Sequence, residues 1–386
     1  MRVESLPLVS VLMPVRDVKF FAPALGSILS QTGVDFEVIC IDDSVDARGS
    51  SVLAEFSATQ PKLRVLRNGG RGIADALNWG LASARGELIA RMDADDISLP
   101  GRLTAQASYL EMHPEIGVLG TQADVIDASG ARQGRARVPV GPRRVFTYLQ
   151  TGNPLIHPTV MMRRRLLSKV CGYRRSFEGA EDYDLWLRLS AQTTMDNLAE
   201  VFLLHRRHSE QVTTRAQFRQ ARLATLAIVS HNIRQSSGRD PLADLGRIET
   251  WRTAIGAASP SAVADVRELT AARLVDNRGT LRQSGARYLN GACSRAIKRG
   301  SPDIRARLAL ACVRHQLLLY RAGRRTDALR ALLWDALRWR TRLIPAYAKH
   351  ARALLPAARP GPPLAIVGGS MRHGEPSSSV RVNSAE

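Results

Sequence analysis

Short apolar runs alternate with amphipathic segments over the first hundred residues of this 386-residue chain. Runs with strand character lie at 8–15, 36–44, 63–68 and 87–93, and segments with helical spacing of apolar residues lie between them. This alternation is typical of an α/β fold with a doubly wound, mostly parallel sheet flanked by helices. In such sheets ligands bind at the carboxyl ends of the strands.

The pattern continues beyond residue 100 with less regular spacing. We expect a helix at 99–114, a strand region at 116–127, a polar loop at 128–142 and a further strand at 151–164. A helix should follow within 177–192, and a closing segment at 201–213.

Two acidic clusters follow expected strands: Asp42 with Asp43, and the "DADD" stretch at 93–96. Neighbouring carboxylates repel one another, and near a sheet they lose hydration unless something cationic compensates. A divalent metal, an arginine or exposure to solvent in a turn would each offset this repulsion and loss of hydration. A ligand site at this edge is therefore one interpretation of "DADD", and an acidic turn or helix cap before "ISLPGRL" is the other.

The net charge of +20 belongs almost entirely to the second half of the chain. Residues 1–212 have 25 Lys and Arg against 24 Asp and Glu, whereas residues 213–386 have 30 against 11. A hydrophobic content of 45% is enough for a full core and excludes a globally disordered chain.

The four cysteines are far apart and form no C-x-x-C pair, which argues against a disulfide scaffold and a zinc site. We expect Cys40, Cys171, Cys293 and Cys312 to be small buried hydrophobic residues. No segment reaches the ~18 uninterrupted apolar residues of a spanning helix, and the first apolar run is too short for a signal peptide. We expect a cytoplasmic protein, free or at the inner face of the cell membrane.

Six sequence motifs follow one another along the chain: "VSVLMPVRD", "ICIDDS", "ALNWGLASARGELIARMDADD", "LPGRL", "HPTVMMRR" and "EDYDLWLRL". In this order and spacing they resemble family 2 glycosyltransferases, the large inverting group with the GT-A nucleotide-sugar-binding fold. The resemblance covers about residues 6–212. It implies an enzyme that moves a sugar from a nucleotide-diphosphate donor to a hydroxyl of a glycan or lipid-linked acceptor, in cell-surface polysaccharide or glycolipid synthesis.

The resemblance also implies a bound Mg²⁺ or Mn²⁺ at the D-x-D stretch. A divalent cation would stabilise the negative charge of the leaving diphosphate, and it needs only one or two protein carboxylates. Asp93 and Asp95 project to the same side if the segment is extended. The family pattern assigns Asp95 to the metal and Asp93 to the metal shell or the donor ribose, while Asp96 orients its neighbours or caps the next turn.

The ends of the first two strands are the expected donor site, with Pro14, Val15 and Arg16 on one strand and Asp43 on the other. The resemblance implies that Asp43 binds the base, typically uracil, which favours a UDP or dTDP sugar as the donor. Arg16 stands where an aromatic residue that stacks on the base is common. A guanidinium can stack as well, but a role as an exposed loop residue is equally open. Asp42 is expected to be structural.

Three further basic side chains have two open roles each. Arg71, in a loop before the helix expected at 73–85, could reach the diphosphate or be a solvated loop residue. His208 lies in a segment that resembles the family's closing Y-R-x-H and is expected to contact the diphosphate or metal, or to be structural. His157 would lie near the acceptor pocket or be a buried structural histidine.

Inverting transfer needs a base that takes the proton of the acceptor hydroxyl as that hydroxyl attacks the anomeric carbon. The family's E-D motif matches Glu181 and Asp182, which makes Asp182 the expected base and Glu181 its orienting neighbour. Acidic residues that favour a helix N-terminus are the structural alternative. Trp186 would line the acceptor site or pack in the core.

The chain divides into a GT-A catalytic domain at 1–212, a basic helical domain at 213–357 and a disordered tail at 358–386. The basic region suits either a helical bundle with a solvated Arg face or a peripheral contact with anionic membrane. Its arginines are interspersed mainly with Leu and Ala and form no known reading motif, so we expect no specific nucleic-acid partner.

Two rival functions are considered. A sugar-phosphate nucleotidyltransferase also joins a similar sheet to metal-binding carboxylates, but it needs a Gly- and Lys-containing phosphate loop that "MPVRDVKF" lacks. A non-catalytic basic binding protein on a relict GT-A fold would not need Asp182 for its activity.

Overall fold

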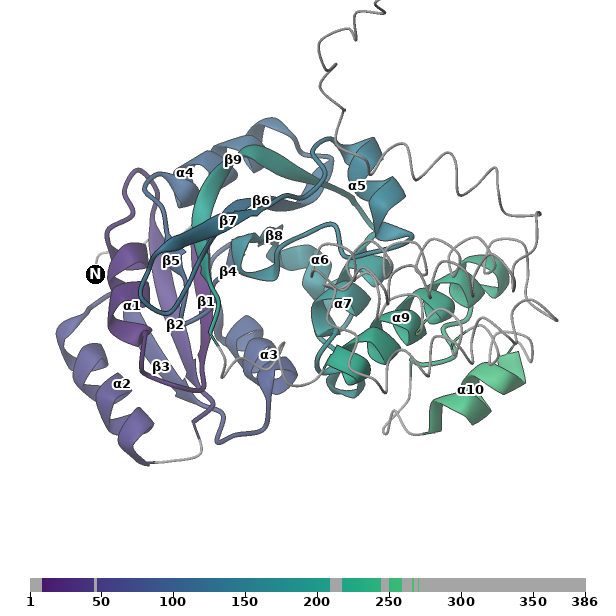
Figure 1. Cartoon of the computed structure of the whole chain (residues 1–386), viewed down its shortest axis with the longest axis horizontal. Coiled ribbons are helices and arrows are strands. Elements are labelled where there is room, and N and C mark those ends of the chain that lie inside the picture. The colour runs from purple at the N-terminus through teal and green to yellow at the C-terminus, as the bar shows by residue number, and fades with distance from the viewer. Residues whose placement is uncertain are drawn as a thin grey trace, which may run out of the picture.

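The computed structural model of the protein describes residues 9–44, 47–208, 217–243 and 250–258, together with single residues 266 and 270. Within these ranges the strands form one sheet in the order β3-β2-β1-β4-β8-β6-β9-β5, and β7 pairs with β6 (Figure 1).

The first half of the sheet is parallel. Its strands and connecting helices are β1 (Val9–Val15), α1 (Phe21–Leu29), β2 (Phe36–Asp42), α2 (Ala47–Thr59), β3 (Leu63–Arg67), α3 (Ile73–Ser83) and β4 (Leu88–Arg91). β1 pairs in parallel with both β2 and β4, and β2 pairs in parallel with β3. The expected doubly wound architecture is confirmed here, and the carboxyl ends of β1, β2 and β4 lie side by side.

The second half is mixed. Its elements are β5 (Ile97–Ser98), α4 (Arg102–Met112), β6 (Ile116–Ile126), β7 (Arg132–Ala136), α5 (Pro142–Leu149), a 3-10 turn (His157–Thr159), β8 (Met161–Arg163), α6 (Arg164–Lys169), a second 3-10 turn (Arg175–Phe177), α7 (Glu181–Leu189) and β9 (Thr194–Arg206). β8 runs antiparallel to β4 and β6, whereas β6 and β9 are parallel.

The prediction of a polar loop at 128–142 is wrong for residues 132–136, which form β7. This exposed strand pairs antiparallel with β6. The pairing is supported across the hairpin, where the buried Asp124 carboxylate binds Arg132 at 2.9 Å and Arg135 at 2.7 Å. An exposed strand held by ion pairs has no alternation of apolar residues by which sequence could reveal it.

The core has two parts, one on each face of the sheet. Alternate residues of β2 divide between them, since Ile39 and Ile41 pack with α3 and α7, whereas Val38 and Cys40 pack with α1 and α4. Because both faces are covered, every residue of β2 is buried.

Among the described residues, helices α9 (Gln217–Ser237) and α10 (Trp251–Ala258) follow the sheet. They lie with α7 on the right of Figure 1, away from α1 and α2. Leu223 and Leu226 of α9 share one hydrophobic cluster with Trp186 of α7. The rest of the expected helical domain and the whole expected tail lie outside the described residues. Across the described ranges, we find no helix with the length and hydropathy needed to cross a membrane.

A buried ionic network joins α7 to α9. Asp184, 1% exposed, accepts hydrogen bonds from Arg174 and Arg188, each at 2.9 Å. Arg174 also contacts Asp240 at 3.0 Å, and Asp240 pairs with Arg234 of α9 at 2.8 Å. Since a buried charge is tolerated only when it is paired, this network holds α7 in one position against α9.

We expect Asp184→Ala to lower the free energy of unfolding by about 3–5 kcal/mol, because two largely buried guanidinium groups lose their shared partner. The matched control is Arg175→Ala, which breaks a mostly exposed pair with Asp75 and should cost at most about 1 kcal/mol. Urea denaturation of both variants measures the difference. Equally small losses would contradict a stabilising role for the network.

Candidate active site

Three carboxylates converge just beyond the end of β4. Asp93, Asp95 and Asp96 each offer an oxygen, and the three oxygens lie within 4.8 Å of one another. The segment is a turn in which the Asp96 N–H donates to the Asp93 carbonyl at 3.4 Å. The extended conformation considered for "DADD" is therefore wrong, and the carboxylates meet because the chain folds back on itself.

Cationic and N–H groups compensate the repulsion within this acidic cluster, Asp93–Asp95–Asp96. Arg91, 3% exposed, places its Nη1 2.5 Å from the Asp93 Oδ2. Asp96, fully buried, accepts the Arg206 backbone N–H at 2.8 Å and lies 3.2 Å from the His205 Nδ1. Burial raises the pKa of Asp96 to about 6, and the His205 charge opposes that rise.

The end of β9 folds over the acidic cluster. The Arg206 guanidinium donates to the Asp95 carbonyl at 2.8 Å, and the His208 Nε2 lies 3.2 Å from the Asp95 Oδ2. The Phe20 ring supports both residues, because the Arg206 guanidinium lies 4.5 Å and the His208 ring 5.5 Å from its centre. The fold thus brings His208 to the cluster from more than a hundred residues away in sequence.

The donor set suits a hard divalent cation. All three ligand groups are carboxylates, and Asp93 and Asp95 are only partly buried, whereas the Asp96 oxygens already bind β9. Mg²⁺ and Mn²⁺ prefer oxygen ligands, and Mg²⁺ usually keeps several waters beside one or two protein carboxylates. Asp93 and Asp95 could hold such an ion, with His208 beside it.

The ends of β1 and β2 form the side of the site expected to bind the donor. The Asp43 N–H donates to the Val15 carbonyl at 2.8 Å, so the two strand ends are joined. Pro14 is partly buried, Val15 is buried and Arg16 is exposed. Asp42 is buried beneath them and pairs with Arg67 at 2.9 Å, which fits its expected structural role.

Asp43 also binds the loop that precedes α3, where its Oδ1 accepts the Gly72 N–H at 3.2 Å. Gly72 has φ of +100°, and a Cβ there would lie 2.4 Å from the Glu178 carboxylate. Only glycine fits this position without strain. Arg71 is exposed next to it, so the loop carrying Arg71 lies against the loop that precedes α7.

Glu181 and Asp182 begin α7. The Asp182 Oδ1 accepts the Tyr183 N–H and its Oδ2 accepts the Asn153 side-chain amide, both at 2.6 Å. The Glu181 carboxylate accepts the Gly179 N–H at 2.6 Å. Burial and the neighbouring Asp182 charge raise the pKa of Glu181 to about 7. Burial also raises the pKa of Asp182, but its two hydrogen bonds and the Arg91 charge oppose this. The two hydrogen bonds and the Arg91 charge thus favour the ionised form of Asp182.

Two aromatic contacts decide between roles left open by sequence. The buried His157 places its Nε2 3.0 Å from the Tyr173 hydroxyl, and its ring meets Trp186 edge-on. Burial and the Arg91 charge lower the pKa of His157 well below its usual value, so the ring is neutral. Trp186 is fully buried and packs in the core. Both residues lie beneath the site as structural support.

Sequence reasoning missed Arg91, Asn153 and Phe20. Arg91 had a visible signal, since it is a charged residue at the end of the apolar run "LIAR". The buried role expected of the cysteines is confirmed for Cys40 and wrong for Cys171, which is exposed. The other two cysteines lie outside the described residues.

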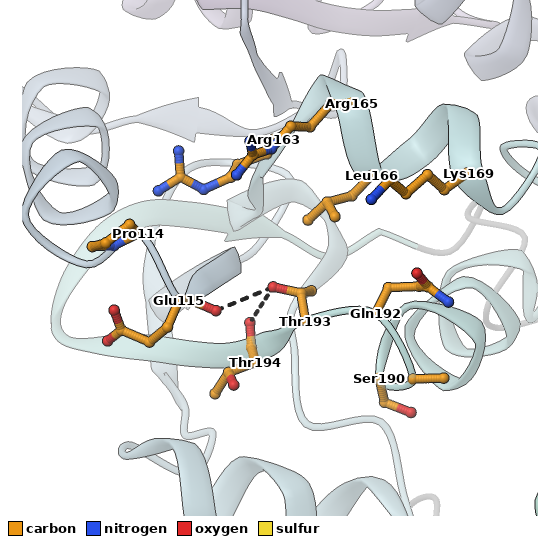
Figure 2. Close-up of a pocket in the computed structure, with 11 residues that line it drawn as sticks. Pro114, Glu115, Arg163, Arg165, Leu166, Lys169, Ser190, Gln192, Thr193 and Thr194 are labelled. Atoms are coloured by element: carbon orange, nitrogen blue, oxygen red, sulfur yellow. Dashed lines mark hydrogen bonds between the residues drawn. The ribbon is translucent and has the colours of Figure 1, made fainter.

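A depression of about 560 Å³ lies elsewhere on the protein (Figure 2). It is lined by α6, by the residues just before β6 and by the link from α7 to β9, including Glu115, Arg165, Lys169 and Thr194. The acidic cluster adjoins the last residues of β9 instead, and no predicted site residue lines this depression.

Known proteins are similar in sequence to part of this chain. The sequence profile of Glycosyl transferase family 2 matches residues 10–171. The O-antigen biosynthesis glycosyltransferase WbnJ of Escherichia coli is 30% identical over 240 residues, which are 61% of this chain and 91% of WbnJ. The amylovoran biosynthesis glycosyltransferase AmsE of Erwinia amylovora is 31% identical over 193 residues, which are 50% of this chain and 72% of AmsE.

The fold is similar to that of solved transferases. The crystal structure of S. aureus TarS 1-349 in complex with UDP-GlcNAc superimposes with a TM-score of 0.53 at 17% identity. The match covers 86% of this chain and 91% of that one. The chain therefore belongs to glycosyltransferase family 2 and is a glycosyltransferase with the GT-A fold.

Proposed function

We propose that this enzyme is an inverting, metal-dependent glycosyltransferase that takes its sugar from a UDP or dTDP donor. The acceptor is a hydroxyl of a glycan or of a lipid-linked glycan in cell-surface polysaccharide or glycolipid synthesis. The observation that carries the proposal is the acidic cluster Asp93–Asp95–Asp96, whose oxygens lie within 4.8 Å of one another beside His208.

In this proposal, the acidic cluster and the other strand ends bind different parts of the donor. Asp95 and Asp93 would hold Mg²⁺ or Mn²⁺, which when bound would supply charge stabilisation for the leaving diphosphate. Asp43, fixed between Val15 and Gly72, binds the base. Arg16, exposed at the end of β1, lies where it can stack on that base, and Arg71 and His208 contact the diphosphate.

Transfer is a single displacement. Asp182 takes the proton of the acceptor hydroxyl while the acceptor oxygen forms a bond to the anomeric carbon from the face opposite the leaving group. The bond between the anomeric carbon and the phosphate oxygen breaks, and its electron pair leaves with the nucleoside diphosphate. Burial and the Asp182 charge raise the pKa of Glu181 to about 7, so Glu181 is protonated in part at neutral pH.

The names of two relatives support a role in the synthesis of cell-surface polysaccharide. WbnJ is named for O-antigen biosynthesis and AmsE for amylovoran biosynthesis. The TarS structure was solved with UDP-GlcNAc, which makes a uridine donor the first to test. Peripheral contact of the basic C-terminal half with anionic membrane, and hence a location at the inner membrane face, stays a prediction.

Calorimetric binding of UDP, dTDP and GDP, each with Mn²⁺ and with a chelator, tests the proposal. We expect one nucleotide, UDP or dTDP, to bind with Mn²⁺ and to lose most of its affinity with the chelator. The matching nucleotide sugar should then release its nucleoside diphosphate in the presence of a glycan acceptor. If no nucleotide binds under either condition, the assignment of the strand ends to the donor is wrong.

A further inference from the structure

Asn153 lies in the segment between α5 and the His157–Thr159 turn, and its side chain has only one possible orientation. Its Oδ1 accepts the Leu155 backbone N–H at 3.2 Å, and a backbone N–H can only donate. The amide nitrogen must therefore face the other way, where it donates to the Asp182 Oδ2 at 2.6 Å. A side-chain amide does not ionise near neutral pH, so this group stays a donor throughout that range.

The segment that carries Asn153 is itself held in place. The Tyr183 hydroxyl donates to the Leu149 carbonyl at 2.6 Å, just before the segment. The Asn197 amide donates to the Pro154 carbonyl at 3.0 Å, just after it. Because α7 and β9 both bind the segment, the Asn153 amide meets Asp182 at a fixed place and direction.

Asp182 therefore has one fixed donor on each oxygen, the Asn153 amide on Oδ2 and the Tyr183 N–H on Oδ1. Hydrogen bonds to the ionised form of a carboxyl group favour that form. Among the described residues, the other charged or titratable groups that face Asp182 are the Arg91 guanidinium from β4, the neighbouring Glu181 and the Tyr173 phenol. Arg91 favours ionisation, whereas burial opposes it.

We propose that Asn153 is a positioning residue that holds the Asp182 carboxylate ionised and oriented to take the proton of the acceptor hydroxyl. This inference rests on the proposed function, because it assigns Asn153 a part in the same proton transfer. Of the two donors, Asn153 is the one that substitution can remove, since the other belongs to the backbone of α7. Its role is distinct from substrate binding, and the two can be separated by experiment.

Two substitutions at Asn153 test the proposal through the pH profile of kcat/KM. Asn153→Ala removes the donated bond, so the pKa of Asp182 rises and the acidic limb of the profile moves to higher pH. Asn153→Asp places a second carboxyl beside Asp182, so the limb should move further in the same direction. We expect kcat to fall about tenfold or more in each variant, as for groups that orient a reacting residue.

Three controls separate positioning from a structural defect. Thr147→Ala, at an exposed site on α5, should leave the profile unchanged. The affinity for the donor nucleotide should match the wild type in both Asn153 variants. Both variants should still unfold in one cooperative transition, with a lower midpoint because a raised Asp182 pKa costs stability at neutral pH. An acidic limb that stays in place, or an effect in Asn153→Asp no larger than in Asn153→Ala, would overturn the proposal.

The titration of Asp182 can also be followed without turnover. The carboxyl carbon signal of Asp182 in ¹³C NMR, assigned by its absence in Asp182→Asn, gives its pKa in the wild type and in Asn153→Ala. A higher pKa in the variant supports the role of Asn153 even if the chosen donor is wrong. Equal pKa values overturn it. Absence of nucleotide binding or transfer in the wild type would instead count against the proposed function.

Discussion

Asp182→Asn is expected to reduce sugar transfer by about 10²–10⁴-fold, the range typical of a lost general base. Asparagine keeps the shape of aspartate and can still accept the Tyr183 N–H, which leaves the start of α7 in place. It cannot take a proton from the acceptor hydroxyl. The affinity for the donor nucleotide should be unchanged, because the role proposed for Asp182 is to act on the acceptor hydroxyl.

The measurement pairs steady-state transfer with calorimetric nucleotide binding. Glu181→Gln is the matched control, since it removes the other carboxyl of the pair while leaving Asp182 ionised. We expect a smaller loss in that variant. Equal losses in the two variants would mean that the pair shares the proton, and normal turnover in Asp182→Asn would move the base to another residue.

Asp95→Ala is expected to weaken Mn²⁺-dependent nucleotide binding by at least about 100-fold, because a divalent metal held at Asp95 would contribute several kcal/mol to diphosphate binding. The substitution removes one carboxylate of the acidic cluster and the partner of His208. The residual nucleotide binding should no longer respond to a chelator, because the chelator acts only by removing the metal.

Asp127→Ala is the matched control for Asp95→Ala. Asp127 is a carboxylate just beyond β6 whose oxygens bind Ser129 in the β6–β7 turn and Gln133 of β7. It lies outside the acidic cluster, so its loss should leave the response to Mn²⁺ unchanged. A chelator response that survives in Asp95→Ala would place the metal on other ligands.

The architecture of the first half follows from local sequence. Strands such as "LVSVLMPV" and "FEVICID" are short, apolar and bounded by turns, and the helices between them carry one apolar face. Burial of both sheet faces then leaves few ways to pair these strands. The acidic cluster was visible for the same reason, because it follows directly on an apolar strand.

The second half was harder to predict from sequence because its contacts are not local. β7 is polar and is held by ion pairs with Asp124, so it has no apolar pattern. Asn153 looks like any loop asparagine until the fold brings Asp182 to its amide. Arg91 looks like a surface charge until burial places it between the acidic cluster and α7.

Sequence alone determined the class of fold, the order of the first strands and the residue types at their ends, because alternation of apolar residues is a local property of the chain. The tertiary structure decided which side chains meet: His208 with Asp95, Asn153 with Asp182, and Arg91 with Asp93. Hydrogen bonds and pKa shifts depend on distance and burial, and both are set by segments that lie far apart in sequence.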